Sequence, residues 1–217
     1  MQIRKQFWIR TAAGCSAIFL GTFAINAATL SSNLIAATTD VETASGDTWL
    51  TASFGTDSSG YMLGDVTLLL ANSGSGVAEV DLYSDGGLQP GSFIAALSSP
   101  STYSSSLSPI TFTSSGVTLA AGSTYWIVLK ALAGDLDWAW TDDNTGTGAG
   151  FQNTWGETSD AGATWFTYDI YPLQFSVDAA SSAVPEPGTA TFLMGGCALL
   201  GALAWKRFRE DKEHPHE

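Results

Sequence analysis

The central part of this 217-residue chain has almost no basic residues, no histidine and no cysteine. Between Thr29 and Ala183 the sequence contains sixteen acidic residues and a single basic one, Lys130, which gives this region a net charge of −15. Nucleic-acid binding requires Lys and Arg side chains that neutralise phosphates, so this composition excludes a nucleic-acid partner. The negative charge instead favours solubility and repels anionic surfaces.

Histidine is confined to His214 and His216, at the C-terminal end of the chain. The central region therefore cannot form a Ser-His-Asp or Cys-His nucleophilic site, or a histidine-ligated zinc or iron site. Paired carboxylates, which are enough for glycoside hydrolysis, are the catalytic arrangement that the composition still allows. Because chance pairs are expected among so many acidic residues, we predict a protein that is not an enzyme.

Both cysteines, Cys15 and Cys197, lie in hydrophobic segments near the ends of the chain, so the central region has no disulfide. It must be stabilised by its hydrophobic core alone. Its length and the 45% content of hydrophobic residues in the whole chain are sufficient for one domain of ordinary size.

The N-terminal segment has the pattern of a secretory signal peptide. Arg4, Lys5 and Arg10 form a basic start, residues 11–24 are apolar, and Ile25-Asn26-Ala27 offers a cleavage site with small residues. We therefore predict a signal peptide over residues 1–27 that engages the general secretion machinery, with the mature chain starting at Ala28.

The C-terminal segment combines three features in a fixed order. Val184-Pro185-Glu186-Pro187 lies at the end of a predicted linker, residues 181–188. Residues 189–205 contain no charged side chain and would span roughly 25 Å as a helix, just below the thickness of the hydrocarbon layer of a membrane. The basic residues Lys206, Arg207 and Arg209 follow, and they predict a cytoplasmic tail over residues 206–217.

This order resembles the PEP-CTERM sorting signal. The resemblance implies that the C-terminal helix holds the exported protein in the inner membrane as a single-pass intermediate, until an exosortase processes it and releases it to the envelope or the exterior. The alternative is an ordinary single-pass anchor, in which the Pro-Glu-Pro segment is only a linker.

The region between these two ends has the pattern of an all-β domain. Apolar and polar residues alternate from Glu79 to Tyr83, and Gly-, Asn-, Asp- and Ser-rich turn segments separate short runs of β-branched and aromatic residues. We predict an antiparallel β-sandwich or jelly-roll-like domain over residues 28–180, with residues 125–129 as its most buried strand. The predicted strands are residues 49–54, 65–70, 79–83, 110–113, 124–129, 137–140, 165–168 and 173–177.

Several strings in this domain are similar to the choice-of-anchor R family. The strings are Ala28–Asn33, Trp49-Leu50, Val80–Asp85, Thr124–Trp126 and Gly162–Trp165. The resemblance covers residues 28–177 and implies an exported β-rich protein that is attached to the cell envelope by one of several anchors. It implies neither an enzymatic activity nor a ligand.

One glycine-rich turn concentrates oxygen ligands that calcium prefers. Asp142, Asp143 and Asn144 precede Thr145-Gly146, and Asp135 and Asp137 lie shortly upstream. The spacing does not match an EF-hand. These three residues are the candidate ligand-binding and metal-binding positions. We predict no cofactor, because such turns are common without an ion, and calcium is the alternative.

A second candidate for binding is Trp155, because it lies in a segment rich in Gly, Asn and Thr that we predict to be an exposed loop. Such a ring could stack on a sugar. Two functions follow from these patterns. The first is a non-catalytic envelope or extracellular-matrix protein that associates with exopolysaccharide or biofilm, and the alternative is a lectin-like carbohydrate-binding module, with calcium as its candidate ion.

Overall fold

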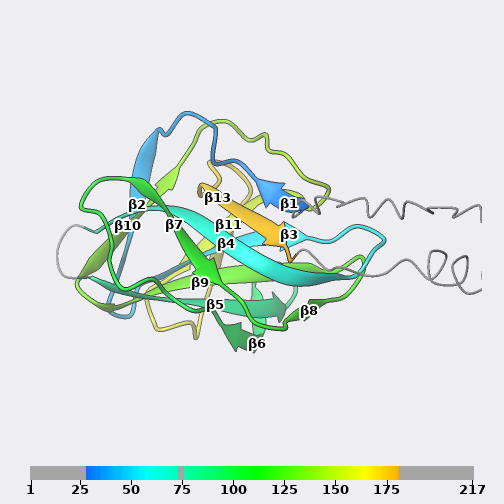
Figure 1. Cartoon of the computed structure of the whole chain (residues 1–217). Helices are drawn as coiled ribbons and strands as arrows, with labels where there is room; N and C mark the ends of the chain where they lie inside the picture. Colours follow the sequence, from blue (N-terminus) through cyan, green and yellow to red (C-terminus); the bar gives the residue numbers. More distant parts are fainter. Residues whose placement is uncertain (1–27, 73–75, 181–217) are drawn as a thin grey trace, which may run out of the picture.

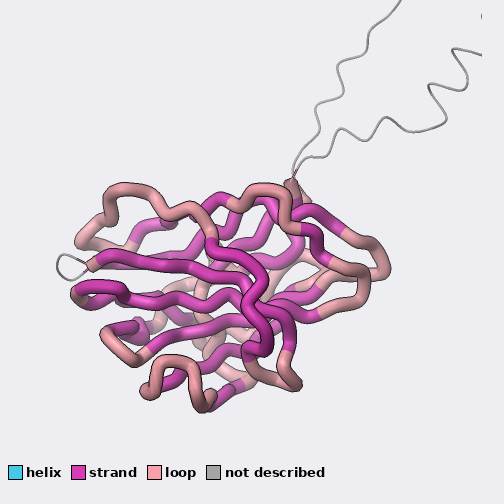
Figure 2. Tube along the Cα trace, turned by 90° about the horizontal axis from the view of Figure 1, so that it is seen from below, coloured by secondary structure: helices cyan, strands magenta, loops and turns pink. Residues whose placement is uncertain are grey.

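The computed structural model describes residues 28–72 and 76–180, and all its regular elements in these ranges are β-strands (Figure 2). They are β1 (Thr29–Ser32), β2 (Asp40–Ser45), β3 (Trp49–Gly55), β4 (Tyr61–Asn72), β5 (Val77–Asp85), β6 (Pro90–Ala96), β7 (Ser108–Thr113), β8 (Thr118–Leu119), β9 (Thr124–Ala133), β10 (Asp135–Trp140), β11 (Phe151–Thr158), β12 (Phe166–Tyr168) and β13 (Phe175–Ala179).

The strands form two antiparallel sheets (Figure 1). Sheet A has the order β1-β13-β4-β10-β2, and β7 and β8 also pair with β4. Sheet B has the order β12-β11-β3-β9-β5-β6. The chain crosses between the sheets repeatedly, so strands that are neighbours in a sheet are mostly far apart in sequence. The prediction of an all-β domain is confirmed.

A single hydrophobic cluster contains buried side chains from both sheets, which is the arrangement of a β-sandwich. Sheet A contributes Val66, Leu68 and Trp138, and sheet B contributes Leu50 and Phe54, each with an exposed fraction of 1% or less. These side chains recur at every second position because alternate residues of a strand point to opposite faces.

Strand β9 is the central buried strand that the sequence predicts. Residues 125–129 are all buried, and β9 lies between β3 and β5 in the middle of sheet B. Tyr125, Ile127 and Leu129 belong to the hydrophobic cluster. Trp126 and Lys130 have the opposite parity and therefore lie on the outer face of sheet B, where Trp126 is nevertheless only 1% exposed.

Five strands were not predicted: β1, β2, β6, β8 and β11. Strand β11, Phe-Gln-Asn-Thr-Trp-Gly-Glu-Thr, reads as a loop because glycine and polar residues interrupt its apolar pattern. Cross-strand pairing with β3 and β12 holds it in the sheet despite this composition. Pro90 is the first residue of β6, a position that proline can occupy because β6 is an edge strand.

Both ends of the described domain lie at the same place, on the right of Figure 1. Strand β1 pairs with β13, and the backbone N–H of Ala179 donates a hydrogen bond to the carbonyl of Ala28. The predicted signal peptide (1–27), linker (181–188), membrane helix (189–205) and tail (206–217) lie outside the described residues. Within residues 28–72 and 76–180, no helix is long and apolar enough to cross a membrane.

Candidate functional site

The predicted calcium turn is an exposed connection between β10 and β11. The Oδ1 atom of Asp143 accepts hydrogen bonds from the N–H (2.9 Å) and the hydroxyl (2.7 Å) of Thr145. Both bonds lower the pKa of Asp143, and the bond from the Thr145 hydroxyl has the larger effect. The Oδ1 atom of Asn144 accepts a hydrogen bond from the N–H of Tyr171, and the N–H of Asp142 donates to the hydroxyl of Thr39. Two of the predicted oxygen ligands are therefore already used in local structure.

The upstream carboxylates do not join this turn. Strand β10 separates Asp135 from Asp142, and the Oδ1 atom of Asp137 accepts a hydrogen bond from Thr43 of β2. In the described part of the chain, no group of three or more His, Cys, Asp or Glu side chains is placed to hold a metal ion. Calcium binding at Asp142, Asp143 and Asn144 stays a prediction.

The prediction that Trp155 is an exposed loop residue is wrong. Trp155 lies on β11, is 8% exposed and belongs to the hydrophobic cluster. Its Nε1–H donates a hydrogen bond to the carbonyl of Ile170, and its ring contacts that of Tyr168 at 4.8 Å between centroids. The physical reason is register: Trp155 pairs with Ala52 of β3, so its side chain points to the core face of sheet B.

Exposed aromatic rings surround Trp155 at this edge of sheet B. Tyr168 pairs with Trp155 across strands and Phe166 pairs with Glu157, so these four side chains share the inner face of the sheet. However, Phe166 is 59% exposed and Tyr168 is 39% exposed. Sheet A therefore does not cover the inner face of β12, and the rings of this edge are open to solvent.

The chain then crosses from sheet B to sheet A, and it carries a further aromatic ring there. Tyr171 is 46% exposed, and its ring lies 5.4 Å from that of Trp140, at the end of β10. Tyr171 has a φ of 58°, a strained conformation for a residue other than glycine. The hydrogen bond from its N–H to Asn144 and the bridge between Trp140 and Leu173 hold it in place. We call Trp140, Trp155, Phe166, Tyr168 and Tyr171 the aromatic shelf.

Two carboxylates accompany the aromatic shelf. The hydroxyl of Tyr168 donates a 2.9 Å hydrogen bond to Glu157 of β11, and this bond is the main reason why the pKa of Tyr168 is raised. Glu42 projects from β2, the edge strand of sheet A. Burial, followed by the charges of Glu157 and Asp40, raises the pKa of Glu42. Ionised Glu42 is thus unfavourable in the folded protein, because it is half-buried and faces other negative charges.

Replacing Glu42 with glutamine should stabilise the protein at neutral pH. The folded state binds the proton of Glu42 more tightly than the unfolded state, whose pKa is near the ordinary value of 4.5. The destabilising effect of the charge is therefore absent below that pH and grows as the pH rises through the folded-state pKa. We expect the melting temperature of Glu42→Gln to exceed that of the wild type at pH 7 and to equal it at pH 3.5. Equal melting temperatures at both pH values would contradict the argument.

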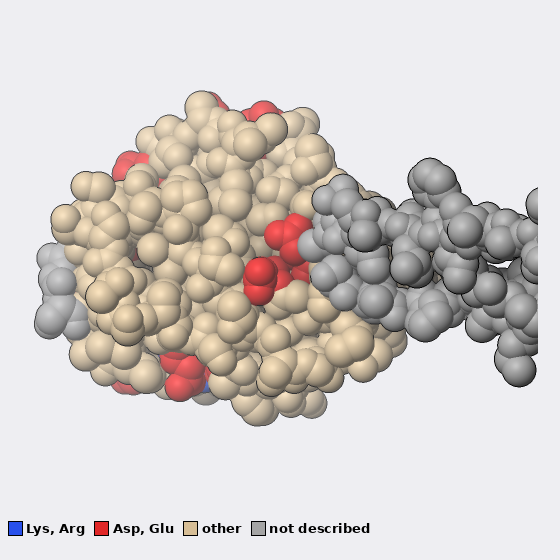
Figure 3. All heavy atoms as spheres, viewed as in Figure 1, with Lys and Arg blue, Asp and Glu red and all other residues tan. Residues whose placement is uncertain are grey.

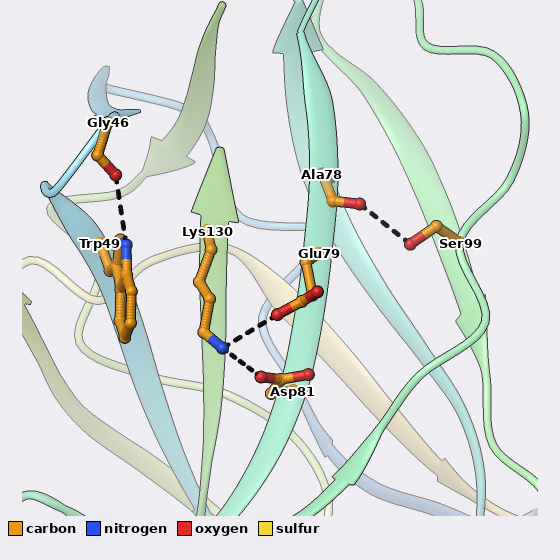
Figure 4. Close-up of polar contacts among 7 residues, drawn as sticks. All are labelled: Gly46, Trp49, Ala78, Glu79, Asp81, Ser99 and Lys130. Carbon is orange, nitrogen blue, oxygen red and sulfur yellow. Dashed lines mark hydrogen bonds and ion pairs between the residues drawn. The ribbon is translucent and has the colours of Figure 1, made fainter. Parts of the chain in front are cut away.

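The one base of the described chain lies elsewhere, on the outer face of sheet B. Lys130 reaches from β9 to Glu79 (3.0 Å) and Asp81 on β5, with Trp49 of β3 on its other side (Figure 4). The Nζ atom of Lys130 lies 4.7 Å from the ring centroid of Trp49. Burial alone would lower the pKa of Lys130, but the hydrogen bonds to Asp81 and Glu79 raise it overall.

Lys130 is consequently unavailable to an external anion. Its side chain is 13% exposed, and two carboxylates and a ring already surround its ammonium group. Figure 3 shows acidic side chains at several places on one face of the molecule and only a trace of basic ones. A ligand of the described domain therefore meets negative charge and no free cation.

The sequence predicted binding at Asp142, Asp143, Asn144 and Trp155 but did not indicate the exposed rings. Among residues 28–72 and 76–180, Phe166, Tyr168, Ile170 and Tyr171 account for four of the twelve exposed large hydrophobic residues. Their crowding into six consecutive positions is a signal that the sequence contains. No sequence pattern indicates that Glu42 belongs to the same site, because it is distant in sequence and comes from the other sheet.

Comparison with models of known protein families identifies the C-terminal segment. The family model of the PEP-CTERM protein-sorting motif (PEP_exosort_dom) matches residues 183–208. None of the curated proteins matches this chain significantly. The matched segment begins shortly after β13 and contains the predicted sorting motif, Val184 to Pro187. It also contains two of the three predicted basic residues, Lys206 and Arg207, and Arg209 follows directly after it. The match supports a protein that is exported to the envelope and sorted by an exosortase.

Proposed function

We propose that this chain is a non-catalytic protein of the cell envelope or extracellular matrix, associated with exopolysaccharide and delivered by an exosortase. The observation that carries the proposal is the sorting motif at residues 183–208, directly after an acidic all-β domain. Residues 189–205 would hold the chain in the inner membrane as a single-pass intermediate, and the basic residues after them would stop transfer. The resemblance of residues 28–177 to the choice-of-anchor R family agrees with this role.

The geometry of the domain suits attachment through one end. Because β1 and β13 are paired, a signal peptide and a sorting segment would both leave from the same place on the domain. Loss of the signal peptide and processing of the sorting segment would therefore leave the rest of the surface undisturbed.

Sorting is tested by replacing the Pro-Glu-Pro residues. In the native host, we expect Pro185→Ala/Glu186→Ala/Pro187→Ala to leave the full-length chain in the inner membrane, whereas the wild type loses the segment beyond the motif. Mass spectrometry of the C-terminus and membrane fractionation measure the two outcomes. The matched control is Ser181→Ala/Ser182→Ala, which changes residues just before the matched segment and should be processed normally. An intact Glu217 terminus on the wild-type protein at its final location would refute the proposal.

A lectin-like role is the second candidate, and the exposed aromatic shelf favours it. Aromatic rings at a protein surface bind sugars through their apolar faces, while neighbouring carboxylates and hydroxyls accept and donate hydrogen bonds. The shelf differs from the site that the sequence predicts, because its exposed rings come from Phe166, Tyr168 and Tyr171, whereas Trp155 is buried against Tyr168.

A further inference from the structure

We propose that the aromatic shelf, with Glu42 and Glu157, binds a glycan that carries free amino groups, such as a polymer with glucosamine units. This inference rests on the proposed association with exopolysaccharide and specifies the chemistry of the glycan. It is carried by two observations: exposed rings on a face that the opposite sheet leaves uncovered, and two carboxylates beside them with no basic partner among the described residues.

The rings supply the surface for the sugar. Phe166 and Tyr168 are two positions apart on β12, so their side chains are neighbours on the same face of the strand. Tyr168 in turn lies on the buried ring of Trp155, which fixes its position. A pyranose ring has an apolar face of axial C–H groups that stacks on aromatic rings, and fixed rings lose little conformational entropy on binding.

The carboxylates determine the charge of the ligand. Glu157 accepts a hydrogen bond from the hydroxyl of Tyr168. Because this hydroxyl is neutral, it does not compensate the negative charge of Glu157. Glu42 adds a second negative charge from the inner face of sheet A, where it pairs with Trp138 of the core. Glu157 lies on the inner face of sheet B, where it pairs with Leu50, and its charge contributes to the raised pKa of Glu42. An ammonium group of an amino sugar placed here would relieve the repulsion between the two carboxylates and also interact favourably with the face of an aromatic ring.

The same charges exclude other ligands. A glycan with uronic acids would bring further negative charge to the shelf, and Lys130, the only base in the described chain, is already held by Glu79 and Asp81 on another face. A second copy of this chain is also unfavourable as the occupant. Pairing two shelves would place four carboxylates together without a cation to separate them.

The test uses the full-length chain in mild detergent and three soluble probes: chitosan oligosaccharides, chitin oligosaccharides of the same length, and alginate oligosaccharides. Isothermal titration measures their binding. We expect chitosan to bind, the N-acetylated chitin probe to bind about tenfold more weakly because it lacks the ammonium groups, and alginate not to bind. Added salt should weaken chitosan binding because the charges at the shelf are partly exposed to solvent.

Variants locate the site. Phe166→Ala and Tyr168→Ala should each weaken chitosan binding about tenfold by removing a stacking surface. Glu157→Gln should weaken chitosan binding but leave chitin binding unchanged, because it alters only the charge. Tyr168→Phe keeps the ring and should retain most of the affinity. This variant keeps the test valid if Tyr168→Ala does not fold.

Two control variants match these changes in kind. Phe93→Ala removes a ring that is 56% exposed on β6, at the opposite edge of sheet B, and Asp65→Asn removes an exposed charge on β4 of sheet A. Both should bind chitosan like the wild type. Equal weakening by Asp65→Asn and Glu157→Gln would show that net charge alone attracts the probe and would overturn the site.

The remaining outcomes separate this inference from the proposed function. Preference for chitin or alginate over chitosan would overturn the amino-sugar inference but leave a lectin-like role standing. Absence of binding to all three probes would overturn the inference, while the sorting experiment would still test delivery by an exosortase. Self-association that Phe166→Ala abolishes would assign the shelf to a second copy and overturn the inference. Release of reducing ends from any probe would instead refute the non-catalytic part of the proposed function.

Discussion

Replacing Trp138 with alanine should destabilise the domain by about 3–5 kcal/mol, which is the usual cost of removing a buried tryptophan. Trp138 is 0% exposed and packs in the cluster between the two sheets. Its Nε1–H donates a 2.9 Å hydrogen bond to the buried carbonyl of Gln174, and that carbonyl would lose this partner in the variant. Because small domains are stable by only about 5–15 kcal/mol, much of the free energy of unfolding would be lost.

Urea unfolding of the full-length chain, followed by circular dichroism, measures this effect. Phe93→Ala is the matched control, since it also removes an aromatic ring but from a position that is 56% exposed, and it should cost less than about 1 kcal/mol. Trp138→Phe keeps much of the volume without the Nε1–H donor and should lie between the two. A Trp138→Ala variant as stable as Phe93→Ala would mean that Trp138 does not pack in the core.

Replacing Lys130 with methionine should cost a comparable amount, about 3–5 kcal/mol, because it breaks a buried ion pair from one side. Asp81 is 1% exposed, and its Oδ1 atom has no hydrogen-bond partner within the described residues. Burial already raises the pKa of Asp81, and this effect outweighs the lowering by Lys130. Without the lysine, the carboxylate would be left in the fold with no counter-charge, since its neighbour Glu79 is also acidic.

The pH dependence of this loss identifies its cause. With the lysine gone, the pKa of Asp81 in the folded state rises further, so the folded protein takes up a proton more readily than the unfolded chain. The deficit of Lys130→Met relative to the wild type should therefore be largest at pH 7 and shrink as the pH falls through that pKa. Lys130→Met/Asp81→Asn, which removes both charges, should recover most of the stability at pH 7. A deficit that is equal at pH 4 and pH 7 and persists in the double variant would indicate lost packing against Trp49 instead.

The two candidate binding regions show how far the sequence leads. It predicted binding at residues 142–144 and at Trp155, and the aromatic shelf includes Trp155 and contacts Asn144 through the N–H of Tyr171. It placed Trp155 at the surface because the flanking Gly, Asn and Thr residues suggested a loop. Pairing of Trp155 with Ala52 reversed that placement, since strand register decides which face a side chain occupies and register depends on contacts between distant strands.

The sequence by itself determined properties that depend on composition and local pattern. These are the absence of a histidine-based site, the negative charge, the all-β character, the buried strand β9 and the sorting motif, which is read as a linear segment. Only the tertiary structure decided that β12 extends beyond the cover of sheet A, that Lys130 is enclosed by Glu79 and Asp81, and that Glu42 and Glu157 lie on the inner faces of the two sheets. Each of these brings together residues of different strands, and no local pattern encodes which strands become neighbours in a sheet or face one another across a sandwich.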